Sequence, residues 1–319
     1  MTIQTPTINS ETAVLGLDIG GTKTAAGVVL FPSGTILHRK VIPTVPNRPG
    51  DLVLEDTCSL ARELRDCAEA AGHRIAGIGA GVAELVDPTG HVTSGQTIQW
   101  AGMPVREHLA GIAPTVVESD VRAAAVGEAL MGAAKEFRCF VYVTVGTGIS
   151  SCLVQDGKPH IGAHGNAIVL ATAPLSFTCP HCGTYSSTVL EQFASGLALA
   201  QRYSERSGNN VIAGEEVTTR AEAGDENAID VVQTAGRALG VSVAFLANVL
   251  DPEAIIVGGG LGLDGRLYWR AMVESVRDHI WADAGKKVPI MAAKLGKDAG
   301  LVGAAASFWN SQIKNHKGE

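Results

Sequence analysis

Two short glycine-rich segments contain the residue types that bind phosphate groups. Asp18-Ile-Gly-Gly-Thr-Lys-Thr24 and Thr144-Val-Gly-Thr-Gly148 each place threonines among glycines, at a turn between two apolar runs. Glycine lets the backbone approach an anion closely and point N–H groups at it, and threonine hydroxyls add further donors. Neither segment has the Gly-Lys-Ser/Thr ending of a P-loop, and neither opens a helix as a dinucleotide-binding fingerprint must. We interpret the pair as two phosphate-binding turns; the alternative is that each is only a glycine-rich hairpin.

Two aspartates stand where phosphoryl-transfer chemistry would need them. Asp18 directly precedes the first turn, and hard cations prefer carboxylate and phosphate oxygens, so we expect it near a magnesium ion carried by a nucleotide. Asp120 lies at a predicted strand-to-helix junction, where aspartate is also a preferred N-cap. With an ordinary pKa of about 3.9 it would be ionised at neutral pH and could take the proton of a substrate hydroxyl during transfer of a γ-phosphoryl group. Capping is the alternative role, and the two are compatible.

A third glycine run, Gly258-Gly259-Gly260, follows a short apolar segment. A flat adenine or ribose could lie over backbone that carries no side chain, although a simple strand-to-helix turn explains the run equally well. The residues that we expect to contact a nucleotide are Asp18, Gly20, Gly21, Thr22, Lys23, Thr144, Gly146, Thr147, Gly148, Gly258, Gly259 and Gly260.

Hydropathy periods predict the elements that position these segments. Strands are expected near residues 13–19, 24–30, 35–42, 75–82, 115–118, 139–145, 149–154 and 254–257, and helices near 52–71, 121–131, 189–206, 228–250 and 300–310. The chain therefore opens with a β-meander, and a second glycine-tipped hairpin repeats the arrangement near residue 146. Cys67 falls on the apolar face of the first helix, so we expect it in the core.

The composition excludes some broad classes of protein. Of 319 residues, 46% are hydrophobic and 18% charged, which is enough for a large core. The net charge of -7 lacks the basic footprint of a general nucleic-acid binder. We expect neither a signal peptide nor a membrane span, because residues 1–11 contain no Lys or Arg and no run of 18 apolar residues follows. Six cysteines are too few for a disulfide-stapled scaffold, so a reducing cytoplasm is expected.

Five segments together resemble the ROK family of bacterial sugar kinases. Besides the two turns they are residues 117–128, 250–260 and 298–304. The resemblance covers nearly the whole chain and implies a two-domain, actin-like ATPase (ribonuclease H-like) α/β fold with a sugar-binding cleft between the domains. It also implies ATP, magnesium, often a homodimer, and Asp120 as the catalytic aspartate. We place a smaller domain at residues 1–118, closed by the C-terminal helix 300–319, and a larger one at 119–299.

The chain departs from this family on the sugar side. Family members commonly carry Gly-Glu-x-Gly-His after the second turn, where Glu and His hold the anomeric side of the sugar; here the run is Gly165-Asn-Ala-Ile-Val169. Where the family has Asn directly before the catalytic aspartate, this chain has Ser119. Where the family has Asn two residues after that aspartate, this chain has Arg122. The loop that usually reads Gly-Val-Pro-Gly ends in Glu84, a new carboxylate. Glu191 keeps the family's remaining sugar-binding acid. The predicted substrate-binding residues are Glu84, Ser119, Asp120, Asn166 and Glu191.

These departures predict a shifted substrate. A hydrogen bond to a charged group contributes roughly 1.5–3 kcal/mol, so losing both Glu and His would cost a hexose about 3–6 kcal/mol, or about 10²–10⁴ in affinity. Glucose is therefore expected to be a poor substrate, and a cyclitol or a modified amino sugar a better one. The hydroxyl that is phosphorylated, and polyphosphate in place of ATP as donor, remain open.

A cysteine segment matches only part of the zinc loop found in this family. That loop has three cysteines and the histidine that is Val169 here, whereas this chain offers Cys179 and Cys182. Two of the four ligands of a tetrahedral site are missing. We therefore predict a metal-free loop, with a zinc site completed by neighbouring histidines as the alternative.

Two other functions compete with that of a kinase. A transcriptional repressor of the same family would need a helix-turn-helix, and only 17 residues precede Asp18. A non-catalytic sugar- or nucleotide-binding member of the family would fit the altered sugar motif, but the retention of Asp120 argues against it.

Overall fold

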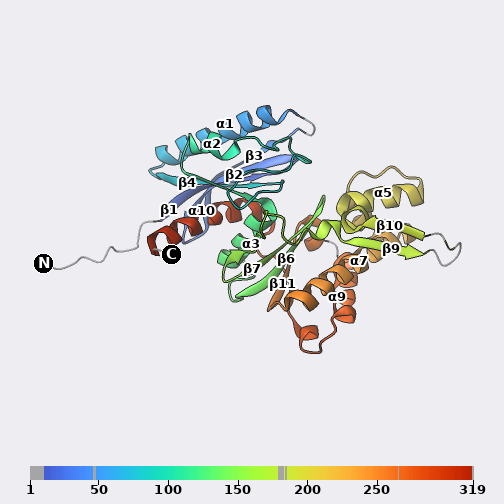
Figure 1. The fold of residues 1–319 in the computed structure, drawn as a ribbon. Helices are drawn as coiled ribbons and strands as arrows, with labels where there is room; N and C mark the ends of the chain where they lie inside the picture. Colours follow the sequence, from blue (N-terminus) through green and yellow to red (C-terminus); the bar gives the residue numbers. More distant parts are fainter. Residues whose placement is uncertain (1–10, 46–47, 179–182, 184, 265, 318–319) are drawn as a thin grey trace. The chain divides into compact units, whose positions relative to one another are not determined.

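The chain divides into two compact units, Met1–Gly127 with Gly300–Glu319, and Glu128–Ala299. The computed structural model describes residues 11–317 except 46–47, 179–182, 184 and 265 (Figure 1). This division falls inside the helix that begins at Asp120, whereas the predicted boundary lies after residue 118.

The first unit contains a five-stranded sheet in the order β3-β2-β1-β4-β5. Its strands are β1 (Thr12–Ile19), β2 (Lys23–Phe31), β3 (Thr35–Pro43), β4 (Ile75–Val82) and β5 (Thr115–Ser119). The first three pair antiparallel and form the predicted meander, whereas β1, β4 and β5 run parallel. Asp18 pairs with Gly81, and Gly81 with Glu118. The carboxyl ends of three parallel strands therefore meet at one edge, the usual place for ligands in α/β sheets.

Four helices accompany this sheet: α1 (Gly50–Ala70), α2 (Val105–Ala110), α3 (Asp120–Met131) and α10 (Ala299–Lys317). Figure 1 shows α1 and α2 on one face of the sheet and α10 on the other. Leu60, Leu64 and Ala68 are among the residues that α1 buries. Cys67 is exposed, so its predicted place in the core is wrong. The buried stripe passes through Ala68, and each residue step turns a helix by about 100°, which carries Cys67 off that face.

The side chains of β4 point alternately to the two faces of the sheet, and this explains why its sequence is rich in glycine. Ile78, Ala80 and Val82 belong to the hydrophobic core of this unit, whereas Gly77 and Gly79 point to the opposite face because side chains alternate along a strand. A Cβ at Gly79 would lie less than 3.0 Å from the carbonyl of Ala304 in α10. The glycines therefore let the backbone of α10 lie directly on the sheet.

Replacing Gly79 by Ala should test this close packing. The added methyl group meets backbone that cannot move aside, so we expect a loss of about 1–3 kcal/mol or more in the free energy of unfolding. Thermal melting of the variant checks it. Gly146→Ala is the control for stability, because a Cβ there meets nothing within 4 Å and the melting temperature should stay unchanged. Equal melting temperatures for both variants would contradict the packing argument.

The second unit repeats the strand arrangement of the first. Its main sheet has the order β12-β11-β6-β7-β8, in which β6, β11 and β12 are parallel and β6, β7 and β8 form an antiparallel meander. The strands are β6 (Cys139–Val145), β7 (Ile149–Gln155), β8 (Lys158–Pro159), β11 (Ala254–Gly258) and β12 (Ile290–Ala292). A separate hairpin pairs β9 (Pro174–Thr178) with β10 (Tyr185–Val189).

Helices complete the second unit, and α7 is central to its core. They are α4 (Leu190–Ala194), α5 (Gly196–Ser207), α6 (Gly214–Glu222), α7 (Glu226–Leu250), α8 (Gly260–Asp264) and α9 (Arg266–His279). The helix predicted at 189–206 is two helices, because Ser195 is extended and caps α5 by accepting from the N–H of Ala198. By length and composition α7 could cross a membrane, but 56% of its apolar window is buried, as in the core helix of a globular protein.

Candidate active site

The first glycine turn joins β1 to β2. Its Gly20 N–H donates to the carbonyl of Lys23 at 3.0 Å, which closes the hairpin. The side chains of Thr22 and Lys23 are exposed at the tip. A Cβ at Gly21 would lie less than 3.0 Å from the methyl group of Thr97, so another loop packs against this turn. The tip is thus a fixed hairpin with exposed hydroxyl and ammonium donors, as phosphate binding requires.

Asp18 lies at the carboxyl end of β1 beneath the start of α10. A Cβ at Gly300 would lie less than 3.0 Å from its carboxylate, so a side chain at this position of α10 would displace the Asp18 carboxylate. Burial raises the pKa of Asp18 to about 6, and the charge of Lys23 opposes the rise. No cluster of three or more His, Cys, Asp or Glu side chains that could hold a metal occurs in the described part of the chain. A single carboxylate fits Mg²⁺ that arrives with a nucleotide, because Mg²⁺ commonly uses one or two carboxylates together with phosphates and water.

Asp120 is the first residue of α3, directly after β5. Its Oδ1 accepts from the N–H of Val121 at 2.6 Å. Burial, together with the negative charges of Asp18 and Glu84, raises the pKa of Asp120 to about 7, although the Val121 N–H and the charge of Arg122 oppose the rise. The ordinary pKa assumed from the sequence is therefore wrong. A carboxylate with a pKa near 7 is suited to a general base at neutral pH.

The raised pKa of Asp120 also makes stability depend on pH. Between about pH 4 and about pH 7 the folded chain holds a proton that the unfolded chain has released, so this carboxyl makes the fold less stable as the pH rises through that window. Asp120→Asn removes the titration. We expect the variant to melt above the wild type at about pH 8, with the difference shrinking toward about pH 5. A melting series across that range checks it, and a difference independent of pH would contradict it.

Glu84 organises a loop rather than standing free. Its Oε1 accepts from the N–H groups of Thr97 and Ile98, both at 2.6 Å. Its Oε2 accepts from the Ser94 hydroxyl and from the N–H of Gln96. Glu84 is buried, and its two oxygens are engaged by four donors. Its predicted contact with substrate stays a prediction, but the hydrogen bonds give this carboxylate a structural role that the sequence did not indicate.

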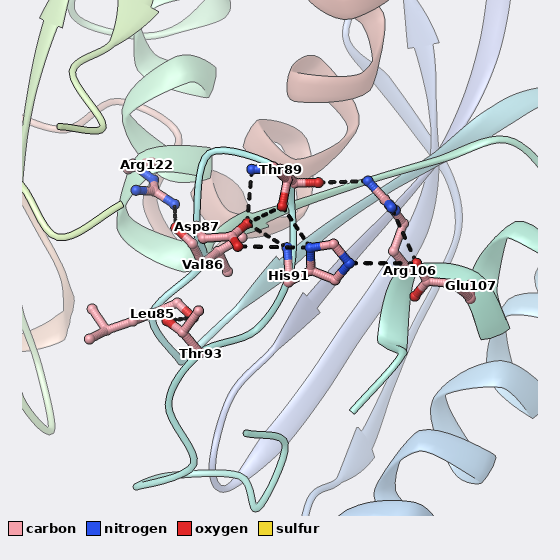
Figure 2. Close-up of polar contacts among 9 residues, drawn as sticks. All are labelled: Leu85, Val86, Asp87, Thr89, His91, Thr93, Arg106, Glu107 and Arg122. Atoms are coloured by element: carbon pink, nitrogen blue, oxygen red, sulfur yellow. Dashed lines mark hydrogen bonds and ion pairs between the residues drawn. The ribbon is translucent and has the colours of Figure 1, made fainter. Parts of the chain in front are cut away.

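Arg122 and Ser119 are also buried beside Asp120. The Arg122 guanidinium donates to the carboxylate of Glu118. Its Nη2 also donates to the carbonyl of Val86 at 2.6 Å (Figure 2). It therefore ties the start of α3 to the loop that follows β4. The Ser119 N–H donates to Glu118 at 2.8 Å. The predicted role of Ser119 in substrate binding remains a prediction.

The same loop contains an aspartate turn that sequence reasoning missed. Asp87 Oδ1 accepts from the N–H and hydroxyl of Thr89 and from the N–H of His91 (Figure 2). The Thr89 hydroxyl, followed by the His91 N–H, lowers the pKa of Asp87 to about 2. Arg106 of α2 donates to the carbonyl of Thr89 at 2.6 Å. The signal was Asp87-Pro-Thr-Gly90, a turn composition that predicts this local hydrogen bonding.

The second glycine turn joins β6 to β7 in the other unit. Gly146 N–H donates to the carbonyl of Gly148 at 2.9 Å, and a Cβ at Gly146 would meet nothing within 4 Å. Glu191, in the first turn of α4, accepts from the N–H of Ile149 at 2.8 Å. A Cβ at Gly148 would lie 2.5 Å from the same carboxylate. The structure thus brings the predicted sugar-side acid Glu191 against the predicted phosphate-binding turn.

The third glycine run lies beside this turn. Gly258 ends β11 and pairs with Thr144 of β6. Gly259 has a φ of 84°, and a Cβ there would lie less than 3.0 Å from the backbone of Val145. Glycine is required here by both backbone conformation and space. Thr144, Gly146 and the glycine run therefore share one edge of the second sheet, at the carboxyl ends of parallel strands.

The altered sugar motif contains a residue in the left-handed region of backbone conformation. Asn166 and Val169 are exposed. Ile168 has a φ of 57°, in the left-handed region, where a β-branched residue is an outlier. This is the position at which the family pattern has glycine, so the turn keeps the glycine conformation without the glycine. Whether Asn166 contacts substrate stays a prediction, and Cys179 and Cys182 lie outside the described residues.

Comparison with known proteins places the chain in a family. The sequence matches the ROK family over residues 14–311. It is 34% identical over 315 residues to a glucokinase of Streptomyces coelicolor, covering 91% of this chain and 96% of that protein. It is 29% identical over 298 residues to an N-acetylmannosamine kinase of Citrobacter koseri, covering 92% of this chain and 97% of that protein.

A solved structure shows the same fold. The ROK family glucokinase of Streptomyces griseus, in complex with glucose and AMPPNP, aligns with a TM-score of 0.78 at 31% identity and covers 92% of this chain and 98% of its own. The meander and parallel strands of each unit are those of the actin-like ATPase fold, as the sequence predicted. This chain therefore belongs to the ROK family.

Proposed function

We propose that this protein is an ATP-dependent kinase that phosphorylates a hydroxyl group of a sugar-like alcohol. The observation that carries the proposal is Asp120, partly buried at the carboxyl edge of a parallel sheet with a pKa near 7. Its relatives include a glucokinase and an N-acetylmannosamine kinase, and a related structure was solved with glucose and AMPPNP.

In the proposed reaction Asp120 accepts the proton of the attacking hydroxyl. The hydroxyl oxygen forms a bond to the γ-phosphorus, the bond from that phosphorus to the β,γ-bridging oxygen breaks, and ADP leaves. The backbone N–H groups and hydroxyls of the turns at 20–23 and 144–148 would hold the phosphates. Asp18 would hold Mg²⁺, which neutralises phosphate charge when it is bound. The run at 258–260 would lie under the nucleoside.

The substrate side supports a shift away from glucose. Asn166 and Val169 replace the Glu and His that hold the anomeric side of the sugar in the family, while Glu191 remains beside Gly148. Amide and isopropyl groups cannot replace a charge-assisted contact to an anomeric hydroxyl. We therefore propose a cyclitol or a modified amino sugar as the preferred acceptor, with Ser119, Glu191 and Asn166 lining the acceptor site and Glu84 shaping it through the 94–98 loop.

A panel of acceptors tests the proposal. ADP formation is measured with glucose, N-acetylmannosamine and several inositols, using ATP and separately polyphosphate as donor. We expect an inositol or an amino sugar to give a higher kcat/KM than glucose, and ATP to be the donor. Glucose as the best acceptor would overturn the substrate proposal. Binding of ADP without turnover of any acceptor would favour the non-catalytic alternative.

Two further features are part of the proposal. We expect a homodimer in the cytoplasm, because the family resemblance implies a dimer and the cysteines described in the structure, Cys58, Cys67, Cys139 and Cys152, are all free thiols. Sedimentation of the purified protein tests the oligomeric state.

A further inference from the structure

The hydroxyl of Ser151 reaches the altered sugar motif at residues 165–169, which we call the acceptor segment. Ser151 lies in β7 and is only 5% exposed, and its Oγ donates to the carbonyl of Ile168 at 2.8 Å. Ile149 belongs to the hydrophobic core of the second unit and Leu153 packs against it. Residues two apart in a strand point to the same face, so Ser151 is a polar residue on an apolar face. Without a partner, its buried hydroxyl would cost free energy.

The partner, Ile168, has a backbone conformation that is unfavourable for isoleucine. Its φ of 57° lies in the left-handed region, where a β-branched side chain is an outlier. Its side chain packs against the core of the second unit. Its carbonyl accepts from the N–H of Leu170 at 2.9 Å as well as from the Ser151 hydroxyl. Packing and two hydrogen bonds therefore hold a conformation that would otherwise relax.

The residues that replace the family's Glu and His lie on either side of this anchored position. They are Asn166 and Val169, and both side chains are exposed. The N–H of Ala167 donates to the carbonyl of Ile161 at 3.3 Å, so that bond closes the loop on itself. The bond from Ser151, by contrast, joins the loop to a strand of the main sheet. Its loss should let the side chains at 166 and 169 shift together.

The second phosphate-binding turn is held independently of the Ser151 side chain. The turn is closed by the N–H of Gly146, which donates to the carbonyl of Gly148 at 2.9 Å. The strand that follows is fixed at its first residue, because the N–H of Ile149 donates to Glu191 at 2.8 Å. Removing the Ser151 hydroxyl should therefore disturb the acceptor segment and leave the turn in place.

We infer that Ser151 is a positioning residue for the acceptor: its hydroxyl holds the acceptor segment where Asn166 and Val169 contact that substrate. The inference rests on the proposed function, since it takes the acceptor to lie at residues 166 and 169. Ser151 acts through the acceptor segment and not on the reacting atoms. Its loss should therefore weaken binding of the acceptor without slowing the chemical step.

Ser151→Ala tests the inference, with Ser275→Ala as the matched control. Ser275 is also 5% exposed, and its hydroxyl donates to the carbonyl of Arg237 at 2.9 Å, between α9 and α7. Loss of one hydrogen bond implies about a 3-fold to 10-fold rise in KM for the best acceptor in Ser151→Ala. KM for ATP and kcat should stay within about 2-fold of the wild type. Ser275→Ala should leave all three constants unchanged.

A double-mutant cycle shows whether Ser151 acts through the acceptor segment. In a chain that already carries Asn166→Ala and Val169→Ala, the contacts that Ser151 positions are gone. Adding Ser151→Ala to that chain should then raise KM for the acceptor by less than about 2-fold. The same rise in both backgrounds would overturn the inference.

The outcomes separate this inference from the proposed function. If Ser151→Ala phosphorylates the acceptor with an unchanged KM, the positioning role is wrong although the protein is a kinase. An equal rise in KM for ATP and for the acceptor also overturns it. If the wild type phosphorylates no acceptor, calorimetric binding of the same sugars and inositols replaces KM. Weaker binding to Ser151→Ala then supports the inference, whereas equal binding, or no binding to the wild type, overturns it. Thermal melting of each variant confirms that it is folded.

Discussion

Asp120→Asn is expected to lower kcat by about 10²–10⁴-fold, because an amide cannot accept the proton of the attacking hydroxyl and general base catalysis contributes about that much. The amide is close in size to the carboxyl, so KM for ATP should change little. Initial rates at saturating acceptor and ATP check the prediction. Asp51→Asn is the matched control, since Asp51 is an exposed residue of α1 and its loss should leave kcat unchanged.

The pH dependence of kcat, measured for the wild type and for the variant, makes the result decisive. The wild-type kcat should rise with pH through about 7 and then level, because the base must be deprotonated. The residual rate of Asp120→Asn should lose that dependence. A variant that keeps the wild-type kcat, with an unchanged pH profile, would show that Asp120 is only the first residue of α3 and not a base.

Restoring the family's sugar motif should produce a change of similar size in the opposite direction. In the triple variant Asn166→Glu, Ile168→Gly and Val169→His, we expect kcat/KM for glucose to rise by about 10²–10⁴-fold, from two regained charge-assisted contacts. The exposed side chains at 166 and 169 leave room for these groups, and the φ of 57° at residue 168 already suits glycine. Coupled assays with glucose and with the best cyclitol measure the exchange.

Ile168→Gly alone is the control for this prediction. It relaxes the backbone without adding a ligand, so glucose activity should stay at the wild-type level. If kcat/KM for glucose rises as much in the single variant as in the triple variant, loop strain rather than lost contacts limits glucose use. If it rises in neither variant, residues 166 and 169 do not determine the acceptor.

Local patterns were sufficient to predict the elements around the site. The turns at Gly20 and Gly146 follow from glycine between two apolar runs, and both hairpins occur where expected. The junction at Asp120 was also predictable, because a polar Ser-Asp pair separates a β-rich run from an alanine-rich helix. Such patterns involve only residues close together in the sequence, so they can be recognised without knowledge of the tertiary structure.

The electrostatics could not be predicted, because they depend on residues far apart in the chain. Asp18, Glu84 and Asp120 interact since β1, β4 and β5 are neighbours in the sheet, and only the pairing of those strands reveals it. The role of Glu84 could not be predicted for the same reason. Its hydrogen-bond donors come from residues 94–98, so the carboxylate is not free as the sequence suggested.

The packing of α10 on the glycine face of β4 imposes an order on biosynthesis. The strands of the first unit leave the ribosome early, yet the helix that covers Gly79 is synthesised only after the whole second unit. The second unit is contiguous and can fold during translation. Until α10 is synthesised, one face of the first sheet stays uncovered and can bind chaperones or aggregate. A message truncated before the codon for Gly300 would therefore yield a chain whose first unit cannot complete its fold.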